Sequence, residues 1–401
     1  QANTTGAENV AIGAFALDAN TTASGNTAIG KDALTACTTG HSNTAIGNFS
    51  LQTLTTANHC TAIGKSALPD NTSGTQNVAV GNFSLFDTTT GSNHTAVGYN
   101  TLAANTTGSD NCAFGSLALD ENTTGSDNNA FGKQALSANT TGGSNTAMGH
   151  ACLDANTTAS HNTAFGFVSL TDNTTGTSNT ALGSAALKQN VTGSSSIAIG
   201  YRALELGTAL TQQLAIGNDA GRNTTGSDNV FIGHEAGTAN TTGHSNTATG
   251  HRAFMSNTTG NSCVATGLGA LKANTTGTSN VAIGKNSLLS NTTGDNNTAV
   301  GIESLKQCTT GGTNCAFGIE ALRDVTTGND NTCLGKSAGE PMTTGSNNLL
   351  LGHDAGRGNS PSGEVTTGSH NVVLGNNDIN NLFCADTSIS SSDSRDKTDV
   401  E

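Results

Sequence analysis

Residues 26–34 read NTAIGKDAL, and residues 43–51, one repeat later, read NTAIGNFSL. The glycine of this phrase returns in register 22 times between Gly13 and Gly375. Successive glycines are 17 residues apart, except for a step of 16 that ends at Gly233 and a last step of 23 that contains an insertion at 357–365. A period this strict indicates a repeat architecture rather than a set of globular domains.

The composition agrees with a repeat protein and excludes several other classes. Only 33% of the 401 residues are hydrophobic and 3% aromatic, while charged residues make up 11% and proline occurs 3 times. The chain has too few hydrophobic residues for a conventional core, and too few charged residues and prolines for a disordered chain. The net charge is −14 and no basic block is present, so we expect no nucleic-acid partner. No apolar run approaches 18 residues, so we expect no membrane insertion.

We number the repeat positions 1 to 17 from the asparagine of NTAIG, so that Asn26 is position 1 and Gly30 position 5. Position 4 is nearly always large and apolar, position 9 is leucine in twelve consecutive repeats from Leu17 to Leu204, position 3 is nearly always alanine and position 8 is small. Recurrent glycines and this spacing exclude an α-helix. We predict two short strands per repeat, at positions 2–4 and 7–9, with a corner at the position-5 glycine and a return turn at NTTG.

Stacked in parallel, such repeats form an all-β structure, a parallel β-solenoid or β-roll of 17-residue coils. At a rise of about 4.8 Å per coil the array is a rod roughly 100 Å long. Positions 3 and 4 point to opposite faces because they are neighbours in a strand. We predict that the large residues at positions 4 and 9 fill the inside. The small residues at positions 3 and 8 would then lie outside and allow close approach of another chain, which predicts a fibrous homotrimer or higher homo-oligomer.

Four repeats depart from this pattern in a correlated way. Position 9 becomes glycine at Gly221, Gly237, Gly339 and Gly356. In two of these repeats position 3 is enlarged, to Phe231 and to Leu350. The pattern predicts that volume is exchanged between the two columns.

The phrase NTAIG…AL resembles the SVAIG…A repeat of trimeric autotransporter adhesin heads, although those heads use a shorter period. The resemblance covers residues 7–375. It implies left-handed parallel β-rolls with three chains side by side.

Residues 392–400 read SDSRDKTDV, which is similar to the SDxRLKxDI opening of the intramolecular chaperone domain of phage tailspikes, tail fibres and endosialidases. That family trimerises the fibre and then cuts itself off. The resemblance implies autocleavage between Ser392 and Asp393, with Lys397 in the place of the family's lysine and Asp396 in the place of an apolar residue. It divides the chain into a repeat array at 1–375, a cap or linker at 376–391, and the start of a self-cleaving chaperone domain at 392–401.

Several residues are candidates for modification or binding. The asparagines that open NTT sequons are candidate N-glycosylation sites, and we assign all of them to position 12. The alternative is that they form a stacked asparagine ladder. They are Asn20, Asn105, Asn122, Asn139, Asn156, Asn173, Asn223, Asn240, Asn257, Asn274 and Asn291. His234 and His251 share position 6 of neighbouring repeats, and Asp110 and Asp127 share position 17. Either pair could help to bind a cation, and an exposed polar ladder is the alternative.

The nine cysteines show no metal-binding spacing and no shared position in adjacent repeats. We therefore expect small buried residues rather than a disulfide ladder, and no metal or other cofactor. No catalytic constellation stands out, so an enzyme is not expected apart from the C-terminal autocleavage.

The expected function is structural. The chain would be a segment of a trimeric tail fibre or surface adhesin, extracellular on a virion or a cell, which gives reach and contacts a host receptor or glycan. The alternatives are an ice-binding solenoid that uses the threonines of NTTG, a bacterial or eukaryotic cell-surface filament, and a polysaccharide-degrading β-helix.

Overall fold

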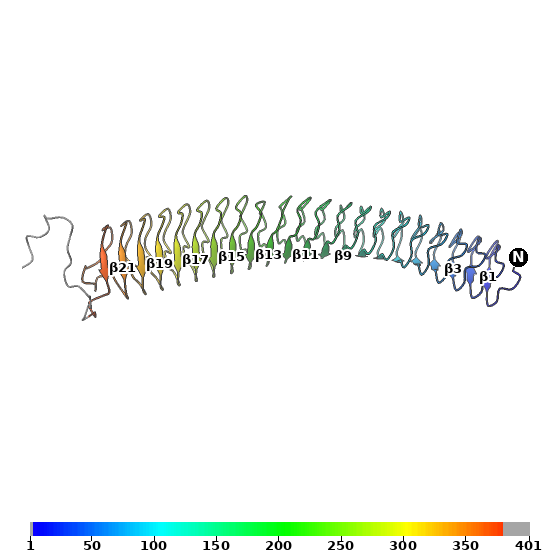
Figure 1. Cartoon of the computed structure of the whole chain (residues 1–401), viewed down its shortest axis with the longest axis horizontal. Helices are drawn as coiled ribbons and strands as arrows, with labels where there is room; N and C mark the ends of the chain where they lie inside the picture. The colour runs from blue at the N-terminus through cyan, green and yellow to red at the C-terminus, as the bar shows by residue number, and fades with distance from the viewer. Residues whose placement is uncertain (1–2, 380–401) are drawn as a thin grey trace, which may run out of the picture.

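A computed structural model describes residues 3–379 and shows one gently curved rod built from a single sheet of 22 short strands (Figure 1). Within these residues there is no helix, and hence none that could cross a membrane. The strands are β1 Val10–Ile12, β2 Thr27–Ile29, β3 Thr44–Ile46, β4 Thr61–Ile63, β5 Val78–Val80, β6 Thr95–Val97, β7 Cys112–Phe114, β8 Asn129–Phe131, β9 Thr146–Met148, β10 Thr163–Phe165, β11 Thr180–Leu182, β12 Ile197–Ile199, β13 Leu214–Ile216, β14 Val230–Ile232, β15 Thr247–Thr249, β16 Val264–Thr266, β17 Val281–Ile283, β18 Thr298–Val300, β19 Cys315–Phe317, β20 Thr332–Leu334, β21 Leu349–Leu351 and β22 Val372–Leu374.

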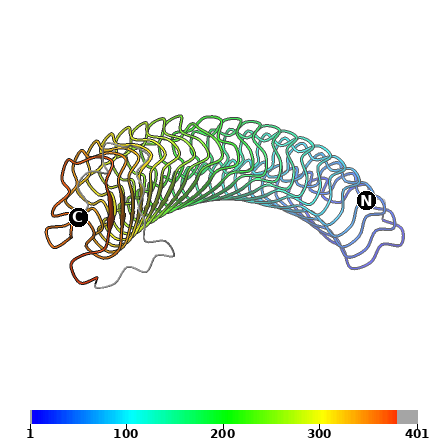
Figure 2. The same ribbon diagram turned by 60° about the vertical axis from the view of Figure 1, so that its left-hand side comes forward.

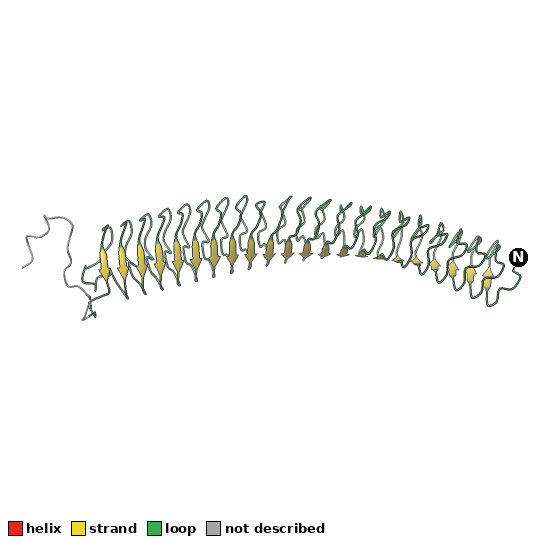
Figure 3. Cartoon of the chain, in the orientation of Figure 1, coloured by secondary structure: helices red, strands yellow, loops and turns green. Residues whose placement is uncertain are grey.

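Each strand pairs in parallel with the strand of the next repeat, so the predicted parallel β-solenoid with coils about 17 residues apart is confirmed. Strands form a continuous column along the rod, and the rest of each coil is turn and loop (Figure 3). The coils stack one after another along the curve of the rod (Figure 2). The irregular steps keep this register: Ala215 pairs with Phe231 across the step of 16, and Leu350 pairs with Val373 across the step of 23. The length changes are therefore absorbed outside the strands.

The prediction of a second strand at positions 7–9 is wrong. This segment is a turn in which positions 7 and 9 have left-handed backbone angles, for example φ 55° at Asp32 and 51° at Leu34. The Asp32 amide donates to Ala14 O of the coil before at 2.9 Å, and the Leu34 amide donates to Ser50 O of the coil after at 2.9 Å. The segment is thus bonded to both neighbouring coils without a strand. Non-glycine residues seldom adopt such angles, so this turn could not be predicted from residue types alone.

The predicted distribution of side chains between inside and outside is also wrong in part. Position-3 alanines such as Ala130 are fully buried, and so are position-8 alanines such as Ala135, whereas position 4 points outward. Only the position-9 leucines lie inside as expected, for example Leu136 at 0% exposure. The coil is narrow, so a leucine on one side leaves room only for an alanine opposite.

The exchange of volume between positions 3 and 9 is confirmed. A Cβ at Gly221 would lie 2.7 Å from Phe231 Cδ2, and one at Gly237 would overlap the same ring from the other side. A Cβ at Gly356 would likewise overlap Leu350. One buried phenylalanine thus replaces two leucines, which shows that positions 3 and 9 share one interior.

The corner at position 5 is confirmed as well. Gly132 has φ of +136°, in the region that favours glycine. A Cβ there would overlap the carbonyl of Gly149 in the next coil. The coils can stack at strand spacing only because this column carries no side chain.

Candidate functional site

The outward face of the rod, defined as the side chains at positions 2, 4 and 6, is unusually apolar for a surface. Within the described residues, 17 of the 19 exposed large apolar side chains lie at these positions. They are Val10, Ile12, Ile63, Tyr99, Met148, Phe167, Leu182, Ile197, Tyr201, Leu268, Ile283, Ile302, Phe317, Ile319, Leu334, Val372 and Leu374. A contiguous apolar surface of this length is typical of an interaction site.

Side chains of the outward face contact one another from coil to coil. The rings of Phe114 and Phe131 at position 4 stack with centroids 4.9 Å apart and an angle of 10° between planes. His150 and Phe167 stack in the same way at position 6, with centroids 5.5 Å apart. The apolar column is interrupted at Thr249 and Thr266, where position 4 is polar. The position-4 column, together with the large apolar side chains of positions 2 and 6 beside it, is therefore an apolar ridge, and the column has one polar break in β15 and β16.

Acidic residues are kept off the outward face. None of the 29 acidic residues lies at positions 2, 4 or 6 of a repeat, and position 6 carries lysine at Lys31, Lys65, Lys133, Lys285 and Lys336. Acidic and basic side chains meet instead at positions 7 and 10, where Glu205 Oε2 accepts from Arg202 Nε at 2.7 Å and from Arg222 Nε at 2.8 Å. A similar network joins Glu340 to Arg323 and Arg357. The net negative charge thus lies away from the apolar ridge.

Most of the sequon asparagines form the ladder that was the alternative to glycosylation. Asn122 Nδ2 donates to Asn105 Oδ1 in the preceding coil at 3.0 Å and to Gly125 O in its own coil at 3.0 Å. Ten of the eleven side chains are buried. Glycosylation itself stays a prediction, but in the folded coil these ten amide nitrogens face the interior.

Asn223 is the exception, because the assignment of this residue to position 12 is wrong. The repeat that contains it is 16 residues long, and the buried Thr224 takes the ladder place, with Asn240 Nδ2 donating to Thr224 Oγ1 at 3.4 Å. Asn223 is half-exposed. The single-residue deletion was visible in the sequence, but its location within the coil was not.

The two threonine rows of NTTG are not equivalent. At position 13 the hydroxyl donates to a backbone carbonyl of the next coil, as Thr123 Oγ1 does to Thr140 O at 3.0 Å. At position 14 the threonines are exposed, as at Thr124. NTTG thus offers water a single free threonine row, whereas the ice-binding alternative requires a flat two-dimensional array.

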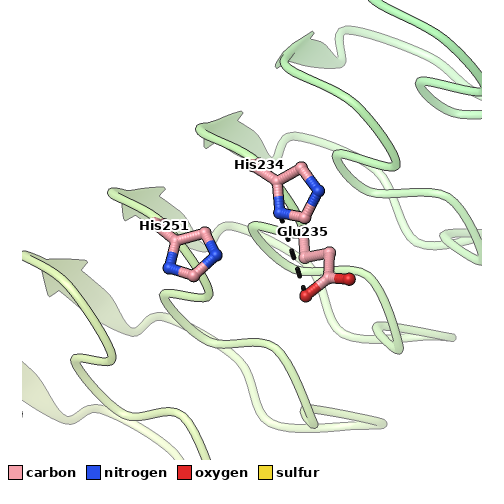
Figure 4. Close-up of side chains that lie close together, drawn as sticks. All are labelled: His234, Glu235 and His251. Carbon is pink, nitrogen blue, oxygen red and sulfur yellow. Dashed lines mark ion pairs between the residues drawn. The ribbon is translucent and has the colours of Figure 1, made fainter.

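His234, Glu235 and His251 form the one group of three or more histidine, cysteine, aspartate or glutamate side chains within residues 3–379 whose ligand atoms lie close together, all within 4.8 Å (Figure 4). The expected stacking of His234 on His251 is confirmed, with ring centroids 5.2 Å apart. Glu235 was missed from sequence because it lies at position 7, whose direction was unknown. Asp110 and Asp127 are exposed and belong to no such group in this part of the chain.

The eight cysteines in the described part of the chain are all free thiols. Burial raises the pKa of the Cys308 and Cys333 thiols to about 12 and that of the Cys37 and Cys263 thiols to about 11. Such thiols stay protonated and unreactive near neutral pH. Six of these eight side chains are buried as expected, whereas those of Cys112 and Cys315 are half-buried, and none of the eight forms a disulfide.

The predicted cleavage residues Ser392, Asp393 and Lys397 lie outside the described residues, as does most of the segment 376–391. Comparison with protein-family models, with curated proteins and with solved structures found no significant match.

Proposed function

We propose that this chain is a structural, fibre-forming protein whose outward face packs against further copies of the same chain. The observation that carries the proposal is the apolar ridge at positions 2, 4 and 6, which follows the strand column from β1 to β22. The contact proposed from small residues at positions 3 and 8 is replaced by one through the large residues at position 4.

The exposed area is sufficient for a stable assembly. If each of the 17 exposed side chains buries about half of its surface, the ridge offers on the order of 1,000 Å² per chain. Stable protein interfaces bury about 800 Å² per partner. The ridge alone can therefore hold two or more chains together.

A second copy fits the ridge better than a globular partner does. A copy presents side chains with the same coil-to-coil spacing of about 4.8 Å, so contacts made in one coil can be repeated along the rod. Because acidic residues are absent from positions 2, 4 and 6, the net charge of −14 does not oppose approach at this face. A homotrimer about a common axis, with the three ridges inside, would cover the apolar residues completely.

Substitutions on the ridge test the assembly. Phe114→Asp with Phe131→Asp is expected to convert the oligomer to a monomer, because it removes a stacked pair and places carboxylates in the contact. The matched control is Thr124→Asp with Thr141→Asp, which adds the same charges to exposed position-14 residues of the same two coils. Light scattering gives the mass, and circular dichroism checks that the coils remain folded. A monomeric wild type at micromolar concentration, or a Phe variant of unchanged mass, contradicts the proposal.

The cellular setting that we propose is a tail fibre or a surface adhesin outside the cell, with the rod giving reach toward a host receptor or glycan. The rod shape and the SDSRDKTDV motif support this setting. Repeats in identical register can slip by one coil, so three chains need an alignment device that does not repeat. A trimeric chaperone domain cut off between Ser392 and Asp393 would supply it.

Expression of the full-length gene tests the processing step. Wild-type chains should yield two fragments by mass spectrometry, and Ser392→Ala should leave one uncut, still trimeric chain. Wild-type protein that stays intact while folding normally would refute the cleavage.

A further inference from the structure

We infer that His234, Glu235 and His251 bind one divalent transition-metal ion, with Zn²⁺ as the preferred ion. Two imidazoles and a carboxylate are a zinc ligand set, and three protein ligands leave one coordination position open to water or to another ligand. All three ligands come from one chain, so the site does not depend on the proposed assembly.

The strands hold the two histidines at the spacing of the coils. His234 follows β14 and His251 follows β15, each two residues after the strand and separated from it by the corner glycine. Their strands are hydrogen-bonded neighbours in register. The distance between the two imidazoles is therefore set by the rigid sheet, and only the side-chain torsions are free.

A small closure of the side chains is enough to form the site. The ligand atoms lie within 4.8 Å of one another, and His234 Nδ1 is 3.9 Å from Glu235 Oε2. Tetrahedral zinc with bonds of about 2.1 Å places ligand atoms about 3.4 Å apart. The histidines are exposed and Glu235 is half-buried, so rotation can supply the remaining movement of about an ångström without shifting the backbone.

Arg252 is the competitor for this site. It lies in the coil after Glu235, and its Nε donates to Glu235 Oε2 at 2.5 Å. A metal must share or replace the contact that Arg252 makes, and the arginine charge opposes an incoming cation. Removal of this side chain should therefore strengthen metal binding.

Other histidines of the chain lack one part of the site and serve as internal controls. His353 has a carboxylate near it, with Nδ1 3.5 Å from Asp354 Oδ2, but it belongs to no group of three. His41 and His59 form a pair with centroids 6.4 Å apart and nearly perpendicular rings, but no third ligand joins them among the described residues. Among residues 3–379, only the coils of β14 and β15 bring two histidines and a carboxylate together.

Calorimetric titration of tag-free, chelator-treated protein with ZnCl₂ tests the inference. We expect one tight site per chain, with affinity reduced at least 10-fold in His234→Ala and in His251→Ala, and several-fold in Glu235→Gln. His353→Ala and His41→Ala should bind like the wild type, and Arg252→Gln should bind several-fold more tightly. Co²⁺ in place of Zn²⁺ should give a visible absorption band that disappears in His251→Ala.

All of the substituted side chains are at least partly exposed, so these variants are expected to fold, which circular dichroism checks. The inference is overturned if His234→Ala and His251→Ala bind zinc like the wild type. It is equally overturned if every histidine variant loses a similar fraction of binding, since that indicates only scattered surface histidines.

Discussion

The coil of β8 and the coil of β14 have the same backbone and fill it in opposite ways. In β8, Ala130 faces a full column of leucines at Leu119 and Leu136, all fully buried. In β14, Phe231 fills the same space from the strand side, and the facing positions are Gly221 and Gly237. The comparison teaches that this fold specifies the total volume inside a coil, and not which side of the coil supplies it.

The largest effect is expected from placing the phenylalanine of β14 in β8 without the two glycines that make room for it. Ala130→Phe puts an aromatic ring against two leucines in a narrow coil, and we expect it to destabilise this part of the rod by about 5 kcal/mol or more. Hydrogen exchange of the β7–β9 amides, compared with that of distant coils, measures the local loss.

The compensated variant Ala130→Phe with Leu119→Gly and Leu136→Gly sharpens the comparison. It reproduces the Gly221, Phe231 and Gly237 arrangement, and glycine suits the left-handed backbone at position 9. We expect protection to return to most of its wild-type level. A triple variant no better than Ala130→Phe would show that positions 3 and 9 do not simply exchange volume.

A smaller loss of stability is expected when the buried phenylalanine is removed from the coil of β14. Phe231→Ala leaves alanine facing two glycines, so no side chain can collapse into the space. Large-to-small changes at buried phenylalanines cost about 3–5 kcal/mol, and the poor collapse places this variant at the upper end. Thermal unfolding followed by circular dichroism, with Phe231→Leu as the milder control, checks the magnitude. Equal melting of the alanine variant and the wild type would contradict the packing described here.

The sequence was enough to predict the coil, its stacking, the corner glycines and the volume exchange, because each shows in a 17-residue period. It was not enough to decide whether position 3 or position 4 faces inward. Alternation along a strand states only that the two oppose each other. The exchange between Phe231 and Gly237 already implied that positions 3 and 9 meet. The turn at positions 7–9, and with it the place of Glu235 beside His234, depends on stacking between coils and has no local signal.

His94 offers a comparison between one coil and its neighbours at position 1, where asparagine is usual. Asn26 Nδ2 donates to Gly40 O at 2.8 Å, and its Oδ1 accepts from the Asn43 amide at 2.9 Å. His94 reproduces both bonds, with Nε2 at 2.7 Å from Gly108 O and Nδ1 accepting from the Asn111 amide at 3.3 Å. This requires the neutral ring, because a protonated Nδ1 cannot accept.

Acid should therefore weaken the wild-type rod more than the His94→Asn variant. Burial lowers the pKa of His94 to about 4, below its ordinary value of 6.5. Between pH 4 and pH 6.5 the unfolded chain binds more protons at this residue than the folded chain does. The contribution of the neutral His94 to the free energy of unfolding is therefore complete above pH 6.5 and is lost as the pH falls toward 4. The loss amounts to ~3 kcal/mol. Denaturation measured at pH 7 and pH 4 should show this difference only in the wild type; identical pH profiles for the two proteins would contradict it.

The smallest effect is expected from the buried asparagine ladder at position 12, where the interior of the ladder can be compared with its natural end. At the end, Cys308 follows Asn291, and Asn291 Oδ1 has no hydrogen-bond partner. Asn122→Cys should create a similar defect in the middle, since Asn105 Oδ1 would lose its donor and Asn139 Nδ2 would keep only Gly142 O as acceptor. The thiol can still reach Gly125 O, as Cys308 Sγ reaches Gly311 O at 3.3 Å. An unsatisfied buried acceptor costs about 1–3 kcal/mol, and the retained thiol contact places the cost near the lower value.

The reverse change, Cys308→Asn, moves the free oxygen from Asn291 to the new residue because Val325 comes next at position 12, so its effect should be close to zero. Chemical denaturation of both variants measures the asymmetry, and equal effects of the two substitutions would show that bonding along the ladder contributes nothing beyond the packing of each asparagine in its own coil.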